Sequence, residues 1–331
     1  MSQSNHRVPL SPRTAALGGL GAAMALTLAA RAVRKARGHG TLRGKVVVIT
    51  GASSGIGRAV ALECSVRGAR VVLAARHQEP LERVAQEVRD LGGEVLVVPT
   101  DVRERLQVER LVAQAVNHFG QLDVMVNNAG KWFIDTVEHS EEARTRDLIE
   151  LNMMGVLYGV QAAVPVMRRQ GSGHIINTSS VEGRISFPFT GVYAGTKGFI
   201  ESMTQSLRQE LMHVEKTGIK VTVVLPVTTR TAIFDNVANI KAGGLGAHMN
   251  APVQEAAYVA RGVVDAMEVY RPVVLPFTPM KGLVLFYDLF PDWANRLLTL
   301  VRVDESASVF SYARRGSYQD ERPHTPLVGS G

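Results

Sequence analysis

The sequence predicts an α/β fold built on a single doubly wound parallel sheet of about seven strands, with helices on both faces. Between residues 44 and 276, short runs of β-branched residues alternate with longer amphipathic stretches. Each apolar run is nearly continuous rather than alternating with polar residues, as expected of strands that are covered on both faces. Repeated strand–helix units of this kind connect in the right-handed sense and build a parallel sheet.

Seven runs are predicted as strands. They are KVVVIT (Lys45–Thr50), RVVLAA (Arg70–Ala75), EVLVVP (Glu94–Pro99), DVMVN (Asp123–Asn127), HIINT (His174–Thr178), KVTVVL (Lys220–Leu225) and VVL (Val273–Leu275). Helices are predicted between them, for example over Leu81–Leu91 and Leu106–Phe119. A fold of this class hosts many functions, so function has to come from the motifs.

The composition is that of an ordinary globular protein, with 46% hydrophobic and 20% charged residues in a chain of 331. The single Cys64 cannot form a disulfide within the chain, which fits a reducing compartment. The formal net charge is +7, but the basic residues are dispersed apart from a cluster at Arg31, Arg34, Lys35 and Arg37. The chain has no zinc-like Cys/His spacing and no RNA-binding aromatic signature. We therefore expect neither a metal site nor a nucleic-acid partner.

Residues 1–40 differ from the rest of the chain. Residues 1–13 are polar, and the segment Thr14–Ala30 is rich in Ala, Gly and Leu and carries no charge. Its length is at the short limit for crossing a bilayer. Three interpretations stay open, namely a membrane anchor, a cleaved or targeting segment, and a packed or loose helix. If the segment is an anchor, the basic residues that follow it place the main domain on the cytoplasmic side.

A second apolar stretch lies near the other end of the chain. Gly282–Phe290 is too short to span a membrane and is interrupted by Asp288 and followed by Pro291. It fits a lid over a pocket, an interfacial membrane helix or a helix packed on the core. The last residues are polar, and we expect them to be disordered.

A glycine-rich turn, TGASSGIG, follows the first predicted strand and precedes a helix. Its glycines are Gly51, Gly55 and Gly57. Such a turn lets the backbone approach a pyrophosphate, which then sits on the helix N-terminus. A turn of this kind can also be an ordinary tight turn, but its place between strand and helix favours nucleotide binding.

Six motifs occur together in a fixed order. They are TGASSGIG, Asp101–Val102, NNAG (Asn127–Gly130), Asn152, Ser180 and YAGTK (Tyr193–Lys197). In order and spacing they resemble the short-chain dehydrogenases/reductases, over about residues 44–276. The resemblance implies a Rossmann-type fold, a nicotinamide cofactor and an oxidoreductase that acts on CH–OH and C=O groups.

The end of the second strand indicates which nicotinamide cofactor to expect. A carboxylate there would bind the adenosine ribose hydroxyls and repel a 2′-phosphate. Here Ala75 is followed by Arg76 and His77, so a guanidinium is available for the phosphate and NADP(H) is predicted. The alternative for Arg76 is a solvated surface residue. Together with the resemblance, this gives a predicted cofactor set of Gly51, Ser53, Ser54, Gly55, Ile56, Gly57, Arg76, Asp101, Val102, Asn127, Ala129, Gly130, Tyr193, Lys197, Pro226 and Thr231. Asn127 has a second interpretation, which is that it ties neighbouring strands together.

Tyr193 and Lys197 are four residues apart and lie on one face of a predicted helix. A phenol is a poor base at neutral pH, and an ammonium at about 4 Å would favour the phenolate by roughly 4 kcal/mol before desolvation. By the resemblance, Tyr193 is the catalytic acid/base, Lys197 also binds the nicotinamide ribose, and Ser180 holds the substrate oxygen. Asn152 would position a water chain that leads from Lys197. Ser179 is the adjacent alternative to Ser180, and the spacing to Tyr193 favours Ser180.

The substrate is expected to be a lipophilic alcohol or ketone. Phe187, Pro188 and Phe189 suggest an apolar pocket wall, and the glycine-rich stretch 241–248 suggests a mobile lid. The sequence departs from the family at Val227, where glycine is common after the proline, and at Gly195, where alanine is usual. Val227 bears on the backbone geometry of the loop that would contact the nicotinamide, whereas Gly195 is a mild cost to the helix rather than a chemical change.

The sequence thus predicts three parts, an N-terminal tail over 1–40, an NADP-binding catalytic domain over 41–280 and a C-terminal extension over 281–331. Competing functions are a catalytically silent NADP-binding scaffold or redox sensor at a membrane, and a membrane-attached assembly protein. The presence of Ser180, Tyr193 and Lys197 favours the enzyme. The resemblance also implies a homo-oligomer, formed through the helices near Asn152 and Tyr193.

Overall fold

The computed structural model describes residues 42–133, 135–231 and 253–300. The apolar segment 14–30, the glycine-rich stretch 241–248 and the polar C-terminal residues lie outside the described residues, so the predictions made for them stay predictions.

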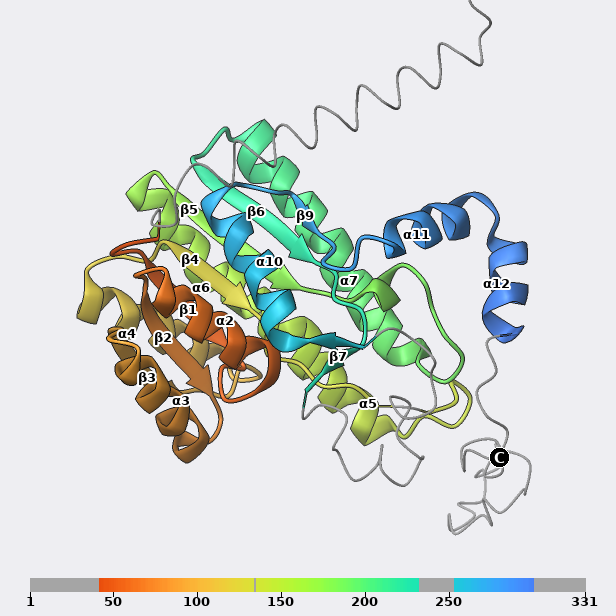
Figure 1. Ribbon diagram of the computed structural model, residues 1–331, viewed down its shortest axis with the longest axis horizontal. Helices are drawn as coiled ribbons and strands as arrows, with labels where there is room; N and C mark the ends of the chain where they lie inside the picture. The colour runs from red at the N-terminus through yellow and green to blue at the C-terminus, as the bar shows by residue number, and fades with distance from the viewer. Residues whose placement is uncertain (1–41, 134, 232–252, 301–331) are drawn as a thin grey trace, which may run out of the picture. The chain divides into compact units, whose positions relative to one another are not determined.

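A parallel sheet forms the centre of the described domain, with the strand order β3-β2-β1-β4-β5-β6-β9 (Figure 1). Its seven strands are β1 (Val46–Thr50), β2 (Arg70–Ala75), β3 (Val95–Pro99), β4 (Val124–Asn127), β5 (Gly173–Thr178), β6 (Ile219–Val224) and β9 (Val273–Val274). Every neighbouring pair is parallel. The predicted α/β fold with a doubly wound parallel sheet is confirmed, and each predicted strand agrees with the structure to within one residue at either end.

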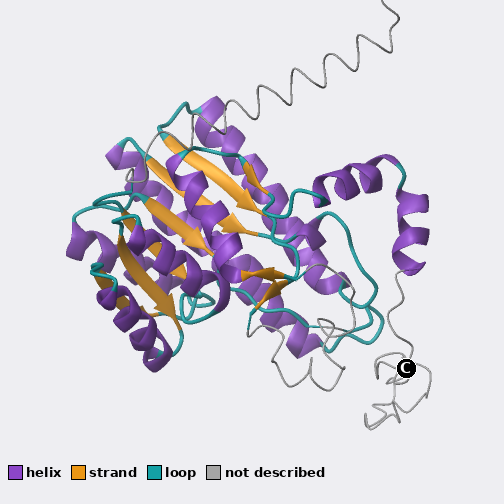
Figure 2. Cartoon of the chain, viewed as in Figure 1, coloured by secondary structure: helices purple, strands orange, loops and turns teal. Residues whose placement is uncertain are grey.

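Helices cover both faces of the sheet (Figure 2). Those over one face are α2 (Gly55–Val66), α3 (Gln78–Asp90) and α10 (Ala256–Glu268), and those over the other are α4 (Arg105–Phe119), α6 (Gly155–Gln170) and α7 (Gly191–Arg208). Within β1, Val47 and Ile49 belong to the first of these two cores, whereas Val46 and Val48 belong to the second. Both faces of the strand are therefore buried, which explains why its apolar run is continuous.

The helix boundaries differ slightly from the prediction. Helix α3 begins at Gln78 rather than at Leu81, because Pro80 is compatible with the first turn of a helix. Cys64 of α2 is fully buried, and burial raises the pKa of its thiol. The cysteine is thus a core residue.

The strand order reverses between β1 and β4. From β1 the chain winds outwards to β2 and β3, and it then returns to β4 on the other side of β1. In open α/β sheets, ligands bind in the crevice at the carboxyl ends of the strands where this reversal occurs. The glycine turn that follows β1 and the segment that follows β4 both lie there.

The helix over Glu142–Gln170 combines α5 (Glu142–Ile149), the π-helical turn η1 (Glu150–Met154) and α6. Among the described residues, it is the one helix whose length and apolar composition would allow it to cross a membrane. In this fold it lies on the sheet, with Val160, Ala163 and Met167 in the core.

Helices α11 (Met280–Leu289) and α12 (Pro291–Leu300) follow β9. Val284 of α11 packs in one apolar cluster with Ile185 and Val227. The large apolar side chains that these helices and their connection expose are Leu285, Leu289, Phe290, Trp293 and Leu297. Of the three interpretations of Gly282–Phe290, the helix packed on the core therefore describes one face of α11. The pocket lid and the interfacial membrane helix stay predictions.

One small element was not predicted. Strands β7 (Thr229–Arg230) and β8 (Gln254–Glu255) pair in parallel as a separate two-stranded sheet. Strands of two residues carry no periodic pattern, so the sequence gives no signal for them.

Candidate active site

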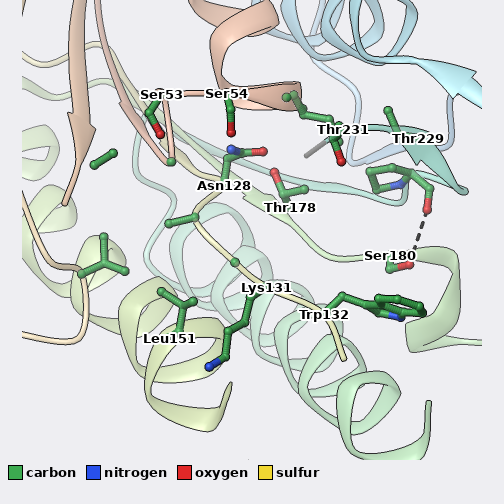
Figure 3. A pocket seen from close by; sticks show the side chains of 18 of the residues that line it. Ser53, Ser54, Asn128, Lys131, Trp132, Leu151, Thr178, Ser180, Thr229 and Thr231 are labelled. Atoms are coloured by element: carbon green, nitrogen blue, oxygen red, sulfur yellow. Dashed lines mark hydrogen bonds between the residues drawn. The ribbon is translucent and has the colours of Figure 1, made fainter. Parts of the chain in front are cut away.

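A cleft of about 420 Å³ lies at the carboxyl ends of the central strands. Figure 3 shows Ser53 and Ser54 of the glycine turn on one side and Ser180 and Trp132 on the other, with Asn128 between them. Most of the predicted site residues line this cleft. They are Gly51, Ser53, Ser54, Gly55, Ile56, Arg76, Asp101, Val102, Ala129, Gly130, Ser180, Tyr193, Lys197, Pro226 and Thr231.

The glycine turn has the geometry of an anion-binding site. Gly51 and Gly55 have φ angles of 66° and 55°, in the left-handed region that favours glycine. A Cβ at position 51 would lie 2.8 Å from the Cα atom of Ala129. Ser54 makes no side-chain capping bond at the start of α2, and the first turn of that helix holds no acidic residue. The N–H groups of this turn thus fit a pyrophosphate.

Arg76 lines the cleft directly after β2. Its guanidinium is exposed, and no ion pair involves it among the residues that the structure describes. The neighbouring carboxylate, Asp101, is instead paired with Arg103 at 2.5 Å. The hydrogen bond from Arg103 holds the pKa of Asp101 below its ordinary value, and the charge of Arg76 acts in the same direction. Because Arg103 compensates Asp101, Arg76 is available to a ligand phosphate.

Asn127 does not line the cleft. Its Nδ2 donates to Oδ1 of Asn177 at 2.8 Å, which ties β4 to β5. A Cβ at Gly159 would overlap Oδ1 of Asn127, so α6 packs directly on this amide. The next residue, Asn128, does line the cleft, and its Nδ2 donates to the carbonyl oxygen of Thr50 at 3.1 Å. The geometry favours the interpretation of Asn127 as a strand tie and places at the cleft a residue that the sequence did not single out.

Asn152 and Gly57 are not among the residues that line the cleft. Asn152 is fully buried in η1, where its Oδ1 accepts from the N–H of Lys131 at 3.0 Å and its Nδ2 donates to the Lys131 carbonyl at 3.0 Å. The same Nδ2 donates to Oγ1 of Thr196 at 3.1 Å. Asn152 thus joins the segment after β4 to α7, and its role in a water chain stays a prediction.

The two adjacent serines have different partners. Ser179 donates its hydroxyl to the carbonyl oxygen of Lys197 at 2.7 Å and so serves to hold the chain on α7. Ser180 Oγ accepts from the N–H of Glu182 at 3.1 Å and donates to the Pro226 carbonyl at 3.5 Å, and Ser180 lies close enough to Tyr193 to lower the pKa of its hydroxyl. Ser180 is therefore the serine that can act together with Tyr193.

Tyr193 and Lys197 lie on one face of α7, as their spacing predicts. The Nζ atom of Lys197 is 5.6 Å from the centre of the Tyr193 ring and donates to the Thr178 carbonyl at 3.0 Å. Burial raises the pKa of Tyr193, Glu182 adds to this rise, and the Ser180 hydroxyl opposes it. Burial lowers the pKa of Lys197 to about 8, against the charge of Glu182.

These directions differ from the expectation that Lys197 lowers the pKa of Tyr193. Both groups are buried, and burial penalises the charged form of each. A buried lysine that is easily deprotonated provides less positive charge to stabilise a phenolate. In the protein alone, Tyr193 is therefore an acid that keeps its proton.

Sequence reasoning missed several lining residues. They are Ala75, His77, Thr100, Asn128, Lys131, Trp132, Leu151, Thr178, Glu182, Val227, Thr228 and Thr229. Ala75 and Thr178 end a strand of the sheet and Thr100 and Asn128 directly follow one, and that position is a signal that could have identified these four. The described residues contain no group of three or more His, Cys, Asp or Glu side chains that could hold a metal ion.

A parallel sheet with a glycine turn at its switch point defines a nucleotide-binding α/β protein. A profile of the short chain dehydrogenase family matches residues 45–241. An uncharacterized oxidoreductase of Staphylococcus saprophyticus is 40% identical over 198 residues, which are 60% of this chain and 79% of the relative. The chain belongs to the short-chain dehydrogenase family, so the resemblance of the six motifs is confirmed.

Solved structures agree with this assignment. A short chain dehydrogenase/reductase from Burkholderia phymatum in complex with NAD matches with a TM-score of 0.71 and 29% identity, over 76% of this chain and 95% of that chain. A short-chain type dehydrogenase/reductase from Mycobacterium marinum matches with a TM-score of 0.64 and 29% identity, over 71% and 94%.

Proposed function

We propose that the chain is an NADP(H)-dependent oxidoreductase that interconverts a carbonyl group and a secondary alcohol, with Tyr193 as the acid/base. The observation that carries this proposal is the placement of Ser180, Tyr193 and Lys197 together on the wall of the cleft that also contains the glycine turn. A bound nicotinamide supplies or accepts the hydride at its C4 atom. The residues of the chain orient the substrate and move the proton.

Ser180 and Tyr193 would hold the substrate oxygen between their hydroxyl groups. During reduction, Tyr193 donates its proton to that oxygen, and during oxidation it takes the proton back. The raised pKa of Tyr193 keeps the proton in place until the oxygen becomes basic. Lys197, when protonated, stabilises the phenolate that remains, and its pKa of about 8 allows it to exchange a proton near neutral pH.

Arg76 supports NADP(H) over NAD(H). It lines the cleft directly after β2, and no carboxylate occupies that position. A guanidinium binds a 2′-phosphate through paired charge-assisted hydrogen bonds. The Burkholderia phymatum relative was solved with NAD, so the choice in this chain rests on its own Arg76.

The walls near Tyr193 support a lipophilic substrate. Trp132 and Tyr193 line the cleft and form one apolar cluster with Phe133, against which Phe189 packs from behind. The predicted wall residues Phe187, Pro188 and Phe189 do not themselves line the cleft. Phe189 has a φ angle of 68°, which is rare for an aromatic residue and is typical of functional sites. Activity confined to small polar sugars would contradict this part of the proposal.

We also propose that the chain is cytoplasmic, that it associates with a membrane through residues 14–30, and that it forms a homo-oligomer. The apolar side chains exposed by α11 and α12 support the association, because patches of this kind mark interaction sites.

The test is to titrate the full chain with NADPH and with NADH and then to follow NADPH oxidation with ketones and aldehydes. The panel runs from short polar compounds to long-chain and steroidal ones. The proposal predicts tighter binding of NADPH and turnover of lipophilic members. Tight binding of NADPH without any turnover would favour a silent scaffold or redox sensor, and no binding of either cofactor would contradict the proposal.

A further inference from the structure

Three contacts fix the segment after β5 against helix α7. Ser179 donates to the carbonyl oxygen of Lys197 at 2.7 Å. A Cβ at Gly183 would lie 2.9 Å from that same oxygen, so only glycine allows the backbones to approach this closely. Arg184 then pairs with Glu201, with Nε 2.6 Å from Oε1. The short 3₁₀ turn η2 (Val181–Gly183) therefore has a fixed position beside the acid/base pair.

Glu182 occupies the middle of this fixed turn. It is one of the residues that line the cleft, together with Ser180, Tyr193 and Lys197. Its backbone N–H donates to Oγ of Ser180 at 3.1 Å, so the carboxyl group is attached next to the serine that would hold the substrate oxygen. Because these contacts hold the backbone of η2, the Glu182 side chain is attached at a fixed point of the cleft wall.

One oxygen of this carboxyl group lacks a hydrogen-bond donor. The Thr190 hydroxyl lies near the carboxyl group and lowers its pKa, but it donates its own proton to the Phe187 carbonyl at 3.0 Å. Oε2 is shielded from solvent and has no hydrogen-bond partner among the described residues. A shielded acceptor without a donor is unfavourable and requires an explanation. A turn of the Glu182 side chain into the cleft that it lines would bring this oxygen to a donor on the substrate.

The ionisation of Glu182 agrees with such a role. Burial raises its pKa to about 7, and the Thr190 hydroxyl and the charge of Lys197 limit the rise. The side chain is thus an acceptor whose charge is incompletely compensated by the chain itself. The other carboxylate that lines the cleft, Asp101, is already paired with Arg103.

We propose that Glu182 determines substrate specificity by accepting a hydrogen bond from a donor group on the carbon next to the reacting carbonyl or alcohol carbon. The substrates would then be α-hydroxy or α-ammonium ketones, or the corresponding alcohols, with an apolar remainder. This inference rests on the proposed function, because it takes Ser180 and Tyr193 as the groups that hold the reacting oxygen.

The experiment uses three ketones that differ only next to the carbonyl, namely acetophenone, α-hydroxyacetophenone and α-aminoacetophenone. Their dissociation constants are measured by calorimetry on the full chain loaded with NADP⁺, and NADPH oxidation is followed separately. The variants are Glu182→Leu, which removes the acceptor at similar volume, and Glu182→Gln, which keeps an uncharged acceptor. Glu138→Gln, an exposed glutamate outside the cleft, is the matched control. Unfolding temperature and NADPH binding of each variant report on folding.

We expect the wild-type chain to bind a donor-bearing ketone about 10- to 100-fold more tightly than acetophenone, as a hydrogen bond to a charged group allows. Glu182→Leu brings this ratio to about one, and Glu138→Gln keeps it. If the hydroxyl is the natural donor, Glu182→Gln keeps part of the ratio, and if the ammonium group is, Glu182→Gln loses all of it.

Equal binding of the three ketones by the wild-type chain overturns the inference. So does a ratio that Glu182→Leu leaves intact, which would make Glu182 a structural or electrostatic residue only. Turnover of any panel ketone by the wild-type chain supports the proposed function whatever Glu182 does. The failure of one proposal is therefore distinguishable from the failure of the other.

Discussion

Gly57 lies so close to Gly51 that a Cβ at position 57 would overlap the carbonyl oxygen of Gly51. The third glycine of the turn therefore does not line the cleft. It allows helix α2 to begin close against the end of β1, and so it positions the N–H groups that Gly51 and Gly55 leave open to a phosphate.

Replacing Gly57 with alanine should weaken cofactor binding and stability together. The added methyl group has to displace backbone rather than a flexible side chain, and overpacking of this kind costs about 1–3 kcal/mol. We expect a lower unfolding temperature and a dissociation constant for NADPH at least about tenfold higher. Thermal unfolding and fluorescence titration measure the two effects.

Gly195→Ala is the control for this glycine. Gly195 lies on the exposed side of α7 between Tyr193 and Lys197, and a Cβ at this position would meet no atom within 4 Å. Alanine should raise the free energy of unfolding by about 1 kcal/mol, because glycine is unfavourable inside a helix. A loss of stability in Gly195→Ala, or normal NADPH binding in Gly57→Ala, would contradict this account of the turn.

Replacing Arg76 with glutamate should reverse the cofactor preference. The carboxylate would repel a 2′-phosphate and could bind the ribose hydroxyls instead. The dissociation constant for NADPH should rise about 10- to 100-fold, while that for NADH stays the same or falls. Arg83→Glu, on the exposed side of α3, is the matched control. An equal effect of Arg76→Glu on both cofactors would argue against a phosphate contact.

The stability of the chain should depend on pH through Glu182. Its pKa is about 7 in the folded chain against 4.5 for a solvent-exposed glutamate, so the folded state retains the proton over this window. The contribution of Glu182 to stability is thus present below pH 4.5 and is lost as the pH rises through about 7. Lys197 and Tyr193 face the same carboxyl group, so the comparison should stay below about pH 8.

Glu182→Gln removes this dependence. Relative to wild type, the variant should therefore be more stable at about pH 7.5 than at about pH 5, that is, its free energy of unfolding should be larger by comparison. Urea unfolding at both pH values measures it. A difference between variant and wild type that does not change with pH would show that Glu182 has an ordinary pKa.

Membrane association should depend on the N-terminal residues. We expect the full chain to sediment with membranes at high salt, because the segment 14–30 is apolar, and we expect removal of residues 1–40 to release it. Fractionation with NADPH binding as a check on folding measures this. A full chain that stays in the supernatant would contradict the anchor, and a truncated chain that still sediments would point to α11 and α12.

The sheet and most of the cleft could be predicted because the signals are local. A continuous apolar run marks a strand buried on both faces, and a glycine turn after the first strand marks the switch point. The choice between Asn127 and Asn128 could not be predicted, because it depends on which of two adjacent side chains faces the sheet core. Glu182 was missed for a different reason. A glutamate in a loop is usually exposed, and its burial results from packing of η2 on α7, which the local sequence does not encode.

The central claim is that Tyr193 carries the proton in a reaction at this cleft. The most direct measurement is NADPH oxidation by the wild-type chain and by Tyr193→Phe, with the ketone that the wild-type chain reduces fastest. We predict a rate at least about 100-fold lower in the variant, with NADPH still bound, as expected when a general acid is removed. Equal rates in the two proteins would show that Tyr193 is not the acid/base and would contradict the proposed mechanism.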